Sequence, residues 1–403
     1  MKTKYELLAP AGDFSMLSAA VNAGADAVYF GLKEFSMRAT AKNFTIADLD
    51  EVEKICSPKK VKRYLTLNTI IYNSELKKLE ETIKKVKEKI DAVICWDLAV
   101  INLCKKYKIP FLISTQASVS NSESAKFYKS LGAKRVVLAR ELNLKQIKEI
   151  SKIIDIECFC HGAMCVAVSG RCFTSQFLFN KSANRGQCLH PCRRKYYVKD
   201  DEGNELMVEN NQVFSAKDLC TLPFIEKMKK AGIKSFKIEG RNRDARYVDA
   251  VVRIYRKALD KKLSKKEIEE GLKELEKIYN KGYSSGFYLK MPTADDFSKT
   301  QSNASVERKH FVGKVTHYFN KSGVAAVKLV SELKVGDKIS VIGKITGIVN
   351  SEIDSLELKN SKIEKGNKGD EVGIKISKVR KNDEVYLIKK NKKRKRKFRV
   401  KTL

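Results

Sequence analysis

The sequence predicts an α/β protein, a (β/α)8 TIM-like barrel followed by a small antiparallel β-barrel domain. Two observations support this fold class. Over about the first 260 residues, short β-branched or apolar runs alternate with longer amphipathic stretches, which is typical of repeated βα units. After Pro292 and a polar stretch, the pattern changes to closely spaced short runs separated by Gly-Asp turns, which is typical of an antiparallel β-barrel.

Eight apolar runs of the first part are expected as strands, and most of them precede a helical stretch. The expected strands are 5–10, 25–31, 63–69, 91–97, 110–116, 134–140, 154–161 and 233–240. Eight such units fit a closed barrel. A doubly wound sheet is the weaker alternative, because no G-x-G-x-x-G turn follows any of these runs.

Composition divides the chain into four parts. We expect the barrel and a C-terminal helical extension over 1–290, a polar linker over 291–310, the small β-barrel over 311–389 and a basic tail over 390–403. The extension contains a charged stretch with apolar positions at helical spacing, 261–279, which predicts a surface helix. The VGDKI and GDEVGIKI elements of the small barrel resemble the second domain of translation elongation factors.

The segment 157–192 holds six of the ten cysteines. Four of them follow the spacing C-x6-C-x15-C-x3-C, namely Cys165, Cys172, Cys188 and Cys192. Thiolates at short, unequal spacings in a glycine-containing loop suit a soft metal centre, either an iron-sulfur cluster or a structural zinc. The spacing lacks the paired C-x2-C knuckles of zinc ribbons. Ordinary free thiols are the alternative, and Cys220 is the reserve fourth ligand.

Residues directly after the barrel strands are candidate site residues, because TIM barrels carry their chemistry at the carboxyl ends of the strands. These positions are mostly polar: Gly12, Asp13, Asn68, Asp97, Gln116, Arg140, Glu141, His161, Glu239 and Arg241. The cysteine segment follows the seventh strand, so we expect it over the same mouth. Arg140 and Arg241 have the geometry to hold carboxylates. The alternative is that each forms a structural ion pair with Glu141 or Glu239.

The chain is strongly basic, with 81 Lys and Arg against 48 Asp and Glu and a net charge of +33. This charge is consistent with a polyanionic partner such as RNA, although a lysine-rich proteome would also produce it. The run from Lys389 to Lys401 is expected to act as an interaction tail, with a merely solvated chain end as the alternative. The first residues lack the apolar core of a signal peptide and no stretch suits a membrane span, so we expect a cytoplasmic protein with reduced cysteines and no membrane partner.

The pattern E-x-F-x-x-G-A-M-C-x4-G-x-C-x-x-S over 157–175 resembles the signature of the collagenase-like peptidase family U-32. Thr174 stands where that signature usually has an aliphatic residue. Further matches to the family extend along nearly the whole chain: LLAPAG at 7–12, GADAVYFG at 24–31, STQAS at 114–118, NRGQC at 184–188, KIEGR at 237–241 and YNKGYSSGF at 279–287.

In layout the chain is most similar to the tRNA hydroxylation proteins of this family. The resemblance implies oxygen-independent hydroxylation of RNA, with 5-hydroxyuridine formed at the tRNA wobble position, a 4Fe-4S cluster on the four cysteines and prephenate as the hydroxyl source. Expected partners are tRNA, a prephenate-like dicarboxylate and a related family member in a homo- or heterodimer. Hydroxylation of ribosomal RNA or of a quinone precursor is an alternative. The expected catalytic residues are Glu157 and His161 for proton transfer, with Arg140, Arg241 and Glu239.

The family name also implies proteolysis as an alternative function. A cysteine protease needs a thiolate beside a histidine base. His161 with Cys165, or His190 with Cys188, are the candidate pairs. A cluster that uses these thiolates would leave no nucleophile, and the sequence has no H-E-x-x-H zinc motif. A third possibility is an RNA-binding scaffold without enzymatic activity.

Overall fold

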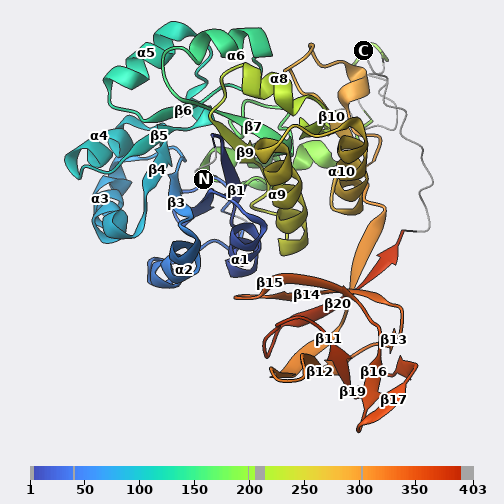
Figure 1. Cartoon of the computed structure of the whole chain (residues 1–403). Helices are drawn as coiled ribbons and strands as arrows, with labels where there is room; N and C mark the ends of the chain where they lie inside the picture. Colours follow the sequence, from blue (N-terminus) through green and yellow to red (C-terminus); the bar gives the residue numbers. More distant parts are fainter. Residues whose placement is uncertain (1–3, 40, 198, 205–213, 301–302, 392–403) are drawn as a thin grey trace.

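The computed structural model describes residues 4–39, 41–197, 199–204, 214–300 and 303–391. Eight parallel strands form a closed barrel (Figure 1): β1 (Glu6–Pro10), β2 (Ala27–Gly31), β3 (Lys62–Leu67), β4 (Ala92–Cys95), β5 (Phe111–Ile113), β6 (Arg135–Val137), β7 (Ile156–Gly162) and β9 (Ser235–Ile238). The barrel closes because β9 pairs with both β1 and β7. The predicted fold class is confirmed, with a strand at each of the eight expected runs; β3 begins one residue before its run and β7 ends one residue after its run.

Helices cover the outside of the barrel (Figure 1): α1 (Phe14–Ala23), α2 (Leu49–Cys56), α3 (Leu76–Val86), α4 (Leu98–Lys106), α5 (Ser122–Ser130), α6 (Leu144–Ile150), α8 (Ile225–Lys230) and α9 (Ala245–Asp260). Each buries apolar residues against the strands; Val248, Val251 and Val252 of α9 are fully buried. The expected surface helix is α10 (Lys265–Lys277), of which only Leu275 is buried. In the described part of the chain, no helix is long and apolar enough to cross a membrane.

A long insertion between β7 and β9 carries the cysteine segment. It contains the short helix α7 (Thr174–Phe179) and returns through β8 (Asp218–Cys220), which runs antiparallel to β7. The two-residue strand β10 (Tyr283–Ser284) then pairs with β8. Neither β8 nor β10 was expected, because two or three residues are too few to show a strand period.

The C-terminal domain is an antiparallel sheet, as predicted. Its strands are ordered β15-β14-β20-β11-β12-β19-β16-β17, with a separate β13–β18 pair. The bounds are β11 (Glu307–Phe319), β12 (Val324–Leu329), β13 (Leu333–Lys334), β14 (Lys338–Gly343), β15 (Gly347–Glu352), β16 (Leu356–Leu358), β17 (Ser361–Ile363), β18 (Lys365–Gly366), β19 (Glu371–Lys375) and β20 (Glu384–Lys390).

The first and last strands extend beyond the predicted domain boundaries. Strand β11 begins at Glu307, within the predicted linker, because the residues before Phe311 pair with the end of β20. The lysines at the end of β20, Lys389 and Lys390, therefore belong to the sheet. The rest of the predicted basic tail, 392–403, lies outside the described residues.

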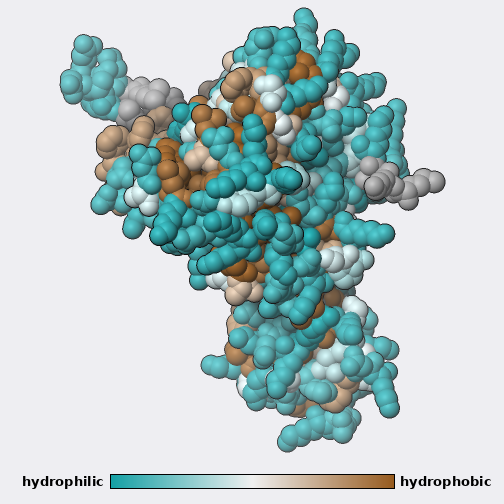
Figure 2. All heavy atoms as spheres, turned by 90° about the vertical axis from the view of Figure 1, so that its left-hand side faces the viewer, coloured by the Kyte–Doolittle hydropathy of each residue, from teal (hydrophilic) through white to brown (hydrophobic). Residues whose placement is uncertain are grey.

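The sheet is docked on the barrel through the turn between β14 and β15. Ser18 of α1 donates a hydrogen bond to the carbonyl of Lys344 at 2.7 Å. Gly347 has a positive φ of 70°, and a Cβ there would lie 2.7 Å from the backbone nitrogen of Ala19. A side chain at this position would push the two domains apart, so glycine permits the close contact. On the face drawn in Figure 2 the surface is mostly hydrophilic, with hydrophobic patches gathered on the barrel.

Candidate functional site

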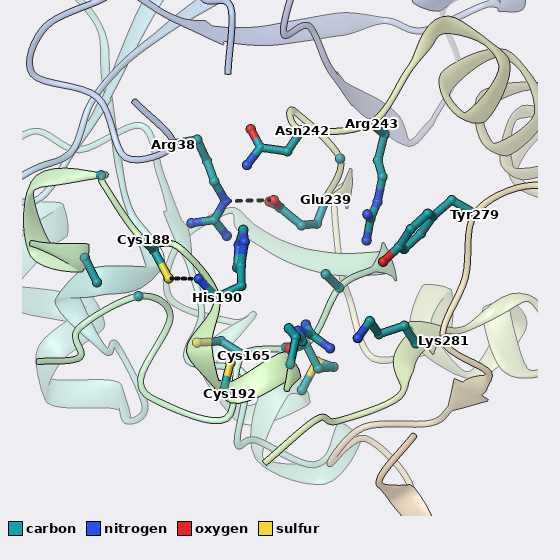
Figure 3. A pocket seen from close by; sticks show the side chains of 17 residues that line it. Arg38, Cys165, Cys188, His190, Cys192, Glu239, Asn242, Arg243, Tyr279 and Lys281 are labelled. Carbon is teal, nitrogen blue, oxygen red and sulfur yellow. Dashed lines mark hydrogen bonds and ion pairs between the residues drawn. The ribbon is translucent and has the colours of Figure 1, made fainter. Parts of the chain in front are cut away.

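A pocket of about 270 Å³ opens between the cysteine segment, the loop after β9 and the segment before β10 (Figure 3). The polar side chains and cysteines of its lining are Arg38, Cys165, Cys188, His190, Cys192, Arg193, Glu239, Asn242, Arg243, Tyr279 and Lys281. In Figure 3 the cysteines lie together at one side, whereas Arg243, Tyr279 and Lys281 lie at the other. We call Cys165, Cys188 and Cys192 the sulfur side. We call the cations that line the rest of the pocket, Arg38, Arg243 and Lys281, the cationic side.

The sulfur side is shaped by the turn at the end of β7. Gly162 has a φ of 109°, and a Cβ there would lie 2.3 Å from the carbonyl oxygen of Glu239. Only glycine fits this turn, which leads the chain to Cys165. Cys192 lies in the 3-10 helix Pro191–Arg193, and the backbone N–H of His190 donates to Cys188 Sγ at 3.4 Å.

The four predicted ligands come together around this side. Burial raises the pKa of the Cys188 and Cys192 thiols, and the nearby thiols of Cys165 and Cys172 add to this effect. Cys172 does not line the pocket; it is half-buried, with its sulfur 3.2 Å from Thr174 Oγ1. The structure therefore places three of the four cysteines in the pocket wall and the fourth beside it.

These cysteines are the residues that could hold a metal centre. Among the described residues, no three His, Cys, Asp or Glu side chains are positioned for one metal ion. A tetrahedral zinc would need sulfurs about 3.8 Å apart, from its Zn–S distance of about 2.3 Å. In a multi-iron cluster each cysteine can bind a different iron atom, so the thiols need not converge on one point.

Cys220, the reserve ligand, lies elsewhere. It pairs with His161 across the β7–β8 ladder and accepts a hydrogen bond from Tyr255 Oη at 3.7 Å. Burial raises the pKa of its thiol to about 11. Cys192 lies near Cys165, Cys172 and Cys188, whereas Cys220 lies away from this group, so the geometry favours Cys192 as the fourth ligand.

The cationic side includes an arginine from the loop after β2. Arg38 forms an ion pair with Glu239, with 3.3 Å between Nε and Oε1. Tyr29 donates to the other oxygen of Glu239 at 3.3 Å. Burial alone would raise the pKa of Glu239, but the charges of Arg38, Arg241 and Arg140 lower it, so the carboxylate stays ionised. Among the described residues, the Arg38 side chain donates its hydrogen bond to Glu239 through Nε and not through its terminal nitrogens.

Arg243 and Lys281 add two more cations. The guanidinium of Arg243 lies 3.7 Å from the centre of the Tyr279 ring and 4.0 Å from Asp218. Lys281 donates to Ser215 Oγ at 3.2 Å. Burial and the neighbouring arginines lower the pKa of Lys281 to about 8. A fourth cation, Arg193, donates to the carbonyls of Met164 and Ala216, so it holds the loop itself.

One carboxylate therefore faces four cations in a partly buried pocket. Glu239 is the single acidic side chain among the pocket-lining residues that the structure describes. Excess positive charge of this kind favours an anionic ligand, and the planar fork of Arg38 suits a carboxylate or a phosphate. The site can thus bind an anion directly beside the cysteine sulfurs.

The two arginines predicted to bind a carboxylate, Arg140 and Arg241, do not line the pocket. Arg241 is buried and donates to Ser36 Oγ at 2.7 Å, to Thr66 Oγ1 at 3.0 Å and to the carbonyl of Met37. Its hydrogen-bonding groups hold the loop that carries Arg38. Arg140 donates to the carbonyl of Ala163 at 3.1 Å and stacks on Phe159.

The two groups predicted to transfer protons also lie away from the pocket. Glu157 is fully buried and pairs with Lys237 at 2.9 Å and with Arg135 at 3.2 Å, at the amino-terminal end of the barrel. His161 is buried, with Nδ1 3.3 Å from Tyr255 Oη. Burial lowers the pKa of His161 to about 3, so the ring is neutral. Both residues therefore lie in the scaffold, and of the five predicted catalytic residues only Glu239 lines the pocket.

Several other polar residues of the predicted mouth have local roles. Asp13 accepts from the backbone of Met16 at 2.9 Å and Asp97 from that of Ala99 at 2.9 Å, so both are helix N-caps. Gln116 donates to the carbonyl of Ser169 at 3.2 Å and supports the cysteine segment. Polarity after a strand thus marks helix starts as well as the site.

Sequence reasoning missed Arg38, Arg243 and Lys281. Arg243 stands two residues beyond Arg241, and Lys281 lies in the NKG run at 280–282 that matches the family. Their positions in the sequence could therefore have identified Arg243 and Lys281 as site residues. Arg38 carried no such signal, because it lies in an irregular polar loop and its position depends on the fold.

Comparisons with known proteins agree with this structure. The model of peptidase family U32 matches residues 12–298. An uncharacterized protease of Methanocaldococcus jannaschii is 42% identical over 96% of this chain and 99% of its own length. A collagenase of Porphyromonas gingivalis is 39% identical over 95% and 97%, and tRNA hydroxylation protein P1 of Bacillus subtilis is 34% identical over 84% and 84%. The chain belongs to peptidase family U32.

Proposed function

We propose that this protein hydroxylates tRNA and forms 5-hydroxyuridine at the wobble position, with a 4Fe-4S cluster on Cys165, Cys172, Cys188 and Cys192 and a prephenate-like dicarboxylate as the hydroxyl source. The main support is the pocket, which brings cysteine sulfurs and a group of cations to one cavity. The relative named as a tRNA hydroxylation protein supports the same activity.

The residues of the cationic side would bind the dicarboxylate. Arg38 offers a fork for one carboxylate, and Arg243 with Lys281 offers donors for the second. Glu239 keeps Arg38 in position through its ion pair. A bound cluster supplies electron-transfer chemistry beside this ligand. The chain's own residues would therefore position the anion beside the cysteines.

The alternative of a peptidase rests on the names of relatives such as the collagenase. The geometry gives it less support. His190 contacts Cys188 through its backbone N–H, while burial raises the pKa of the thiol and lowers that of the imidazole to about 4. A cysteine protease requires the opposite shifts, a thiolate stabilised by a protonated histidine.

Mass spectrometry of tRNA nucleosides from a deletion strain tests the proposal. We expect 5-hydroxyuridine and its derivatives to disappear from the wobble position and to return on complementation with the wild-type gene. Complementation with Cys165→Ala is expected to fail, because a cluster that lacks one ligand loses stability. Iron and sulfide analysis of anaerobically purified protein checks the cluster separately.

A deletion strain that keeps the full level of modified uridine, in a genome without a second copy of the gene, would contradict the proposal. Analysis of ribosomal RNA and of quinones from the same strain tests the two alternative hydroxylation substrates. Gelatin cleavage by the purified protein, lost in Cys188→Ala, would support the peptidase instead.

A further inference from the structure

The segment 163–199, which surrounds the sulfur side, has an unusual charge composition. It contains no Asp or Glu, although the whole chain has 48. It contains seven Lys and Arg residues: Arg171, Lys181, Arg185, Arg193, Arg194, Lys195 and Lys199. All but Arg185 and Arg193 are exposed. The rim of the pocket is therefore complementary to a polyanion.

The same segment exposes apolar and aromatic side chains. Among the described residues, 19 large hydrophobic side chains are exposed, and seven of these lie within 163–199. The aromatic ones are Phe173, Phe177 and Tyr197, which are 64%, 84% and 90% exposed. Such clustering marks an interaction surface, whereas scattered exposed hydrophobic residues do not. We call these three rings, with the exposed cations around them, the aromatic rim.

The aromatic rim is held next to the pocket by specific contacts. Ser175, the buried residue of α7, accepts a hydrogen bond at 3.1 Å from the backbone N–H of Leu189, beside Cys188. Arg194 lies 4.7 Å from the ring centre of Phe179. The rings of Phe173 and Phe177 contact each other, with their centres 6.3 Å apart. Phe173 and Phe177 thus have a fixed relation to the cysteine side of the cavity.

We propose that the aromatic rim binds unpaired nucleotides of an RNA loop, stacking their bases on Phe173, Phe177 and Tyr197 while the exposed cations contact the phosphates. Proteins that bind single-stranded nucleic acid combine aromatic platforms with a basic groove in this way. The inference rests on the proposed function for its substrate. It adds that the enzyme recognises its RNA as an open loop, with the target base directed into the pocket beside Cys188 and Cys192.

The charge favours RNA over a protein partner. A second copy of this chain would bring the same acid-free basic segment against itself if the contact were symmetric, and like charges repel. An apolar face alone would not distinguish these occupants. The combination of exposed rings with a segment that lacks acidic residues does.

Binding of two labelled RNAs to the full-length protein tests the proposal: an anticodon stem-loop and a fully paired duplex of the same length. We expect Phe177→Ala to weaken stem-loop binding about fivefold or more, since stacking on one aromatic residue contributes at least that factor. Duplex binding should change little. The matched control is Phe127→Ala on α5, because Phe127 is 57% exposed but lies outside the segment.

Two further variants separate stacking from apolar contact. Phe177→Tyr keeps a flat ring and should bind the stem-loop like the wild type, whereas Phe177→Leu keeps an apolar side chain and should bind as weakly as Phe177→Ala. Thermal unfolding confirms that each variant is folded. Equal affinity of Phe177→Ala and the wild type for the stem-loop would refute the proposal, and so would normal binding by Phe177→Leu.

A change in oligomeric state is a third result that would count against RNA binding by the aromatic rim. If Phe177→Ala converts a dimer to a monomer with unchanged RNA affinity, the surface is a subunit interface. Analysis of tRNA nucleosides tests RNA binding by the aromatic rim separately from the proposed hydroxylation. A deletion strain that lacks 5-hydroxyuridine, fully rescued by Phe177→Ala, would support the hydroxylation but refute the aromatic rim.

Discussion

Arg38 and Arg241 belong to one hydrogen-bonded unit but differ in what their guanidinium groups contact. Arg241 is 4% exposed and donates to Ser36, Thr66 and the carbonyl of Met37. Arg38, in the loop that these bonds fix, contacts Glu239 through Nε alone among the described side chains. Arg241 therefore holds the loop in place, and Arg38 is available to a ligand.

We expect Arg38→Lys and Arg241→Lys to have different effects. Lysine at position 38 keeps the charge near Glu239 but loses the fork, so the level of modified uridine should fall at least tenfold while the melting temperature stays unchanged. Arg241→Lys should lower the free energy of unfolding by about 1.5–3 kcal/mol for each hydrogen bond that is lost. Thermal unfolding and nucleoside analysis of both variants check this. Full complementation by Arg38→Lys would remove Arg38 from the ligand site.

At the scale of elements, the site depends on how the cysteine segment leaves the barrel. Strand β7 ends at Gly162, which packs against the carbonyl of Glu239 after β9. This contact places Cys165 and Glu239 on two walls of the same cavity. The pocket is therefore a product of two neighbouring strands, β7 and β9, which are distant in sequence but adjacent in the barrel.

Gly162→Ala is expected to damage the pocket, and Gly336→Ala provides the matched control. Both glycines have positive φ, 109° and 84°, but a Cβ at Gly336 meets nothing within 4 Å. The control should cost about 1–2 kcal/mol of strain. Gly162→Ala should cost about 1–3 kcal/mol more, because its Cβ also overlaps the backbone of Glu239. Urea unfolding measures both, and iron content reports the pocket. Equal losses in the two variants would show that the close contact does not matter.

At the scale of the whole molecule, positive charge is present on both domains and continues past the last described strand. Residues 392–403 contain eight Lys and Arg. Strand β20 ends at Lys390, so a truncation after Asn391 preserves its pairing with β11. The effect of the tail can therefore be measured without disturbing the sheet.

We expect the protein truncated after Asn391 to fold normally but to bind tRNA more weakly, with a lower dependence on salt. Each phosphate contact contributes about 0.7–0.9 to the slope of log K against log salt concentration, so loss of eight cations should lower the slope by up to about 7. Titrations at several salt concentrations measure this. An unchanged slope would mean that the tail does not contact RNA.

The sequence alone determined the repeating architecture, because strand and helix periods are local properties of the chain. The alternation of apolar runs predicted all eight barrel strands. Cysteine spacing likewise selected one segment as the candidate metal centre, since an irregular loop that contains glycines can bring its own thiols together. The short strands β8 and β10 carried no such local pattern.

Only the tertiary structure decided which charged residues share the pocket. Arg38 and Glu239 are 201 positions apart, and their ion pair exists because closure of the barrel brings the loops after β2 and β9 together. The sequence could not distinguish Arg38 from Arg241, since a guanidinium has the same chemistry in both positions. Arg241 is buried and bonds to the scaffold, because a buried donor must be satisfied by its nearest acceptors. Arg38 lines the cavity instead.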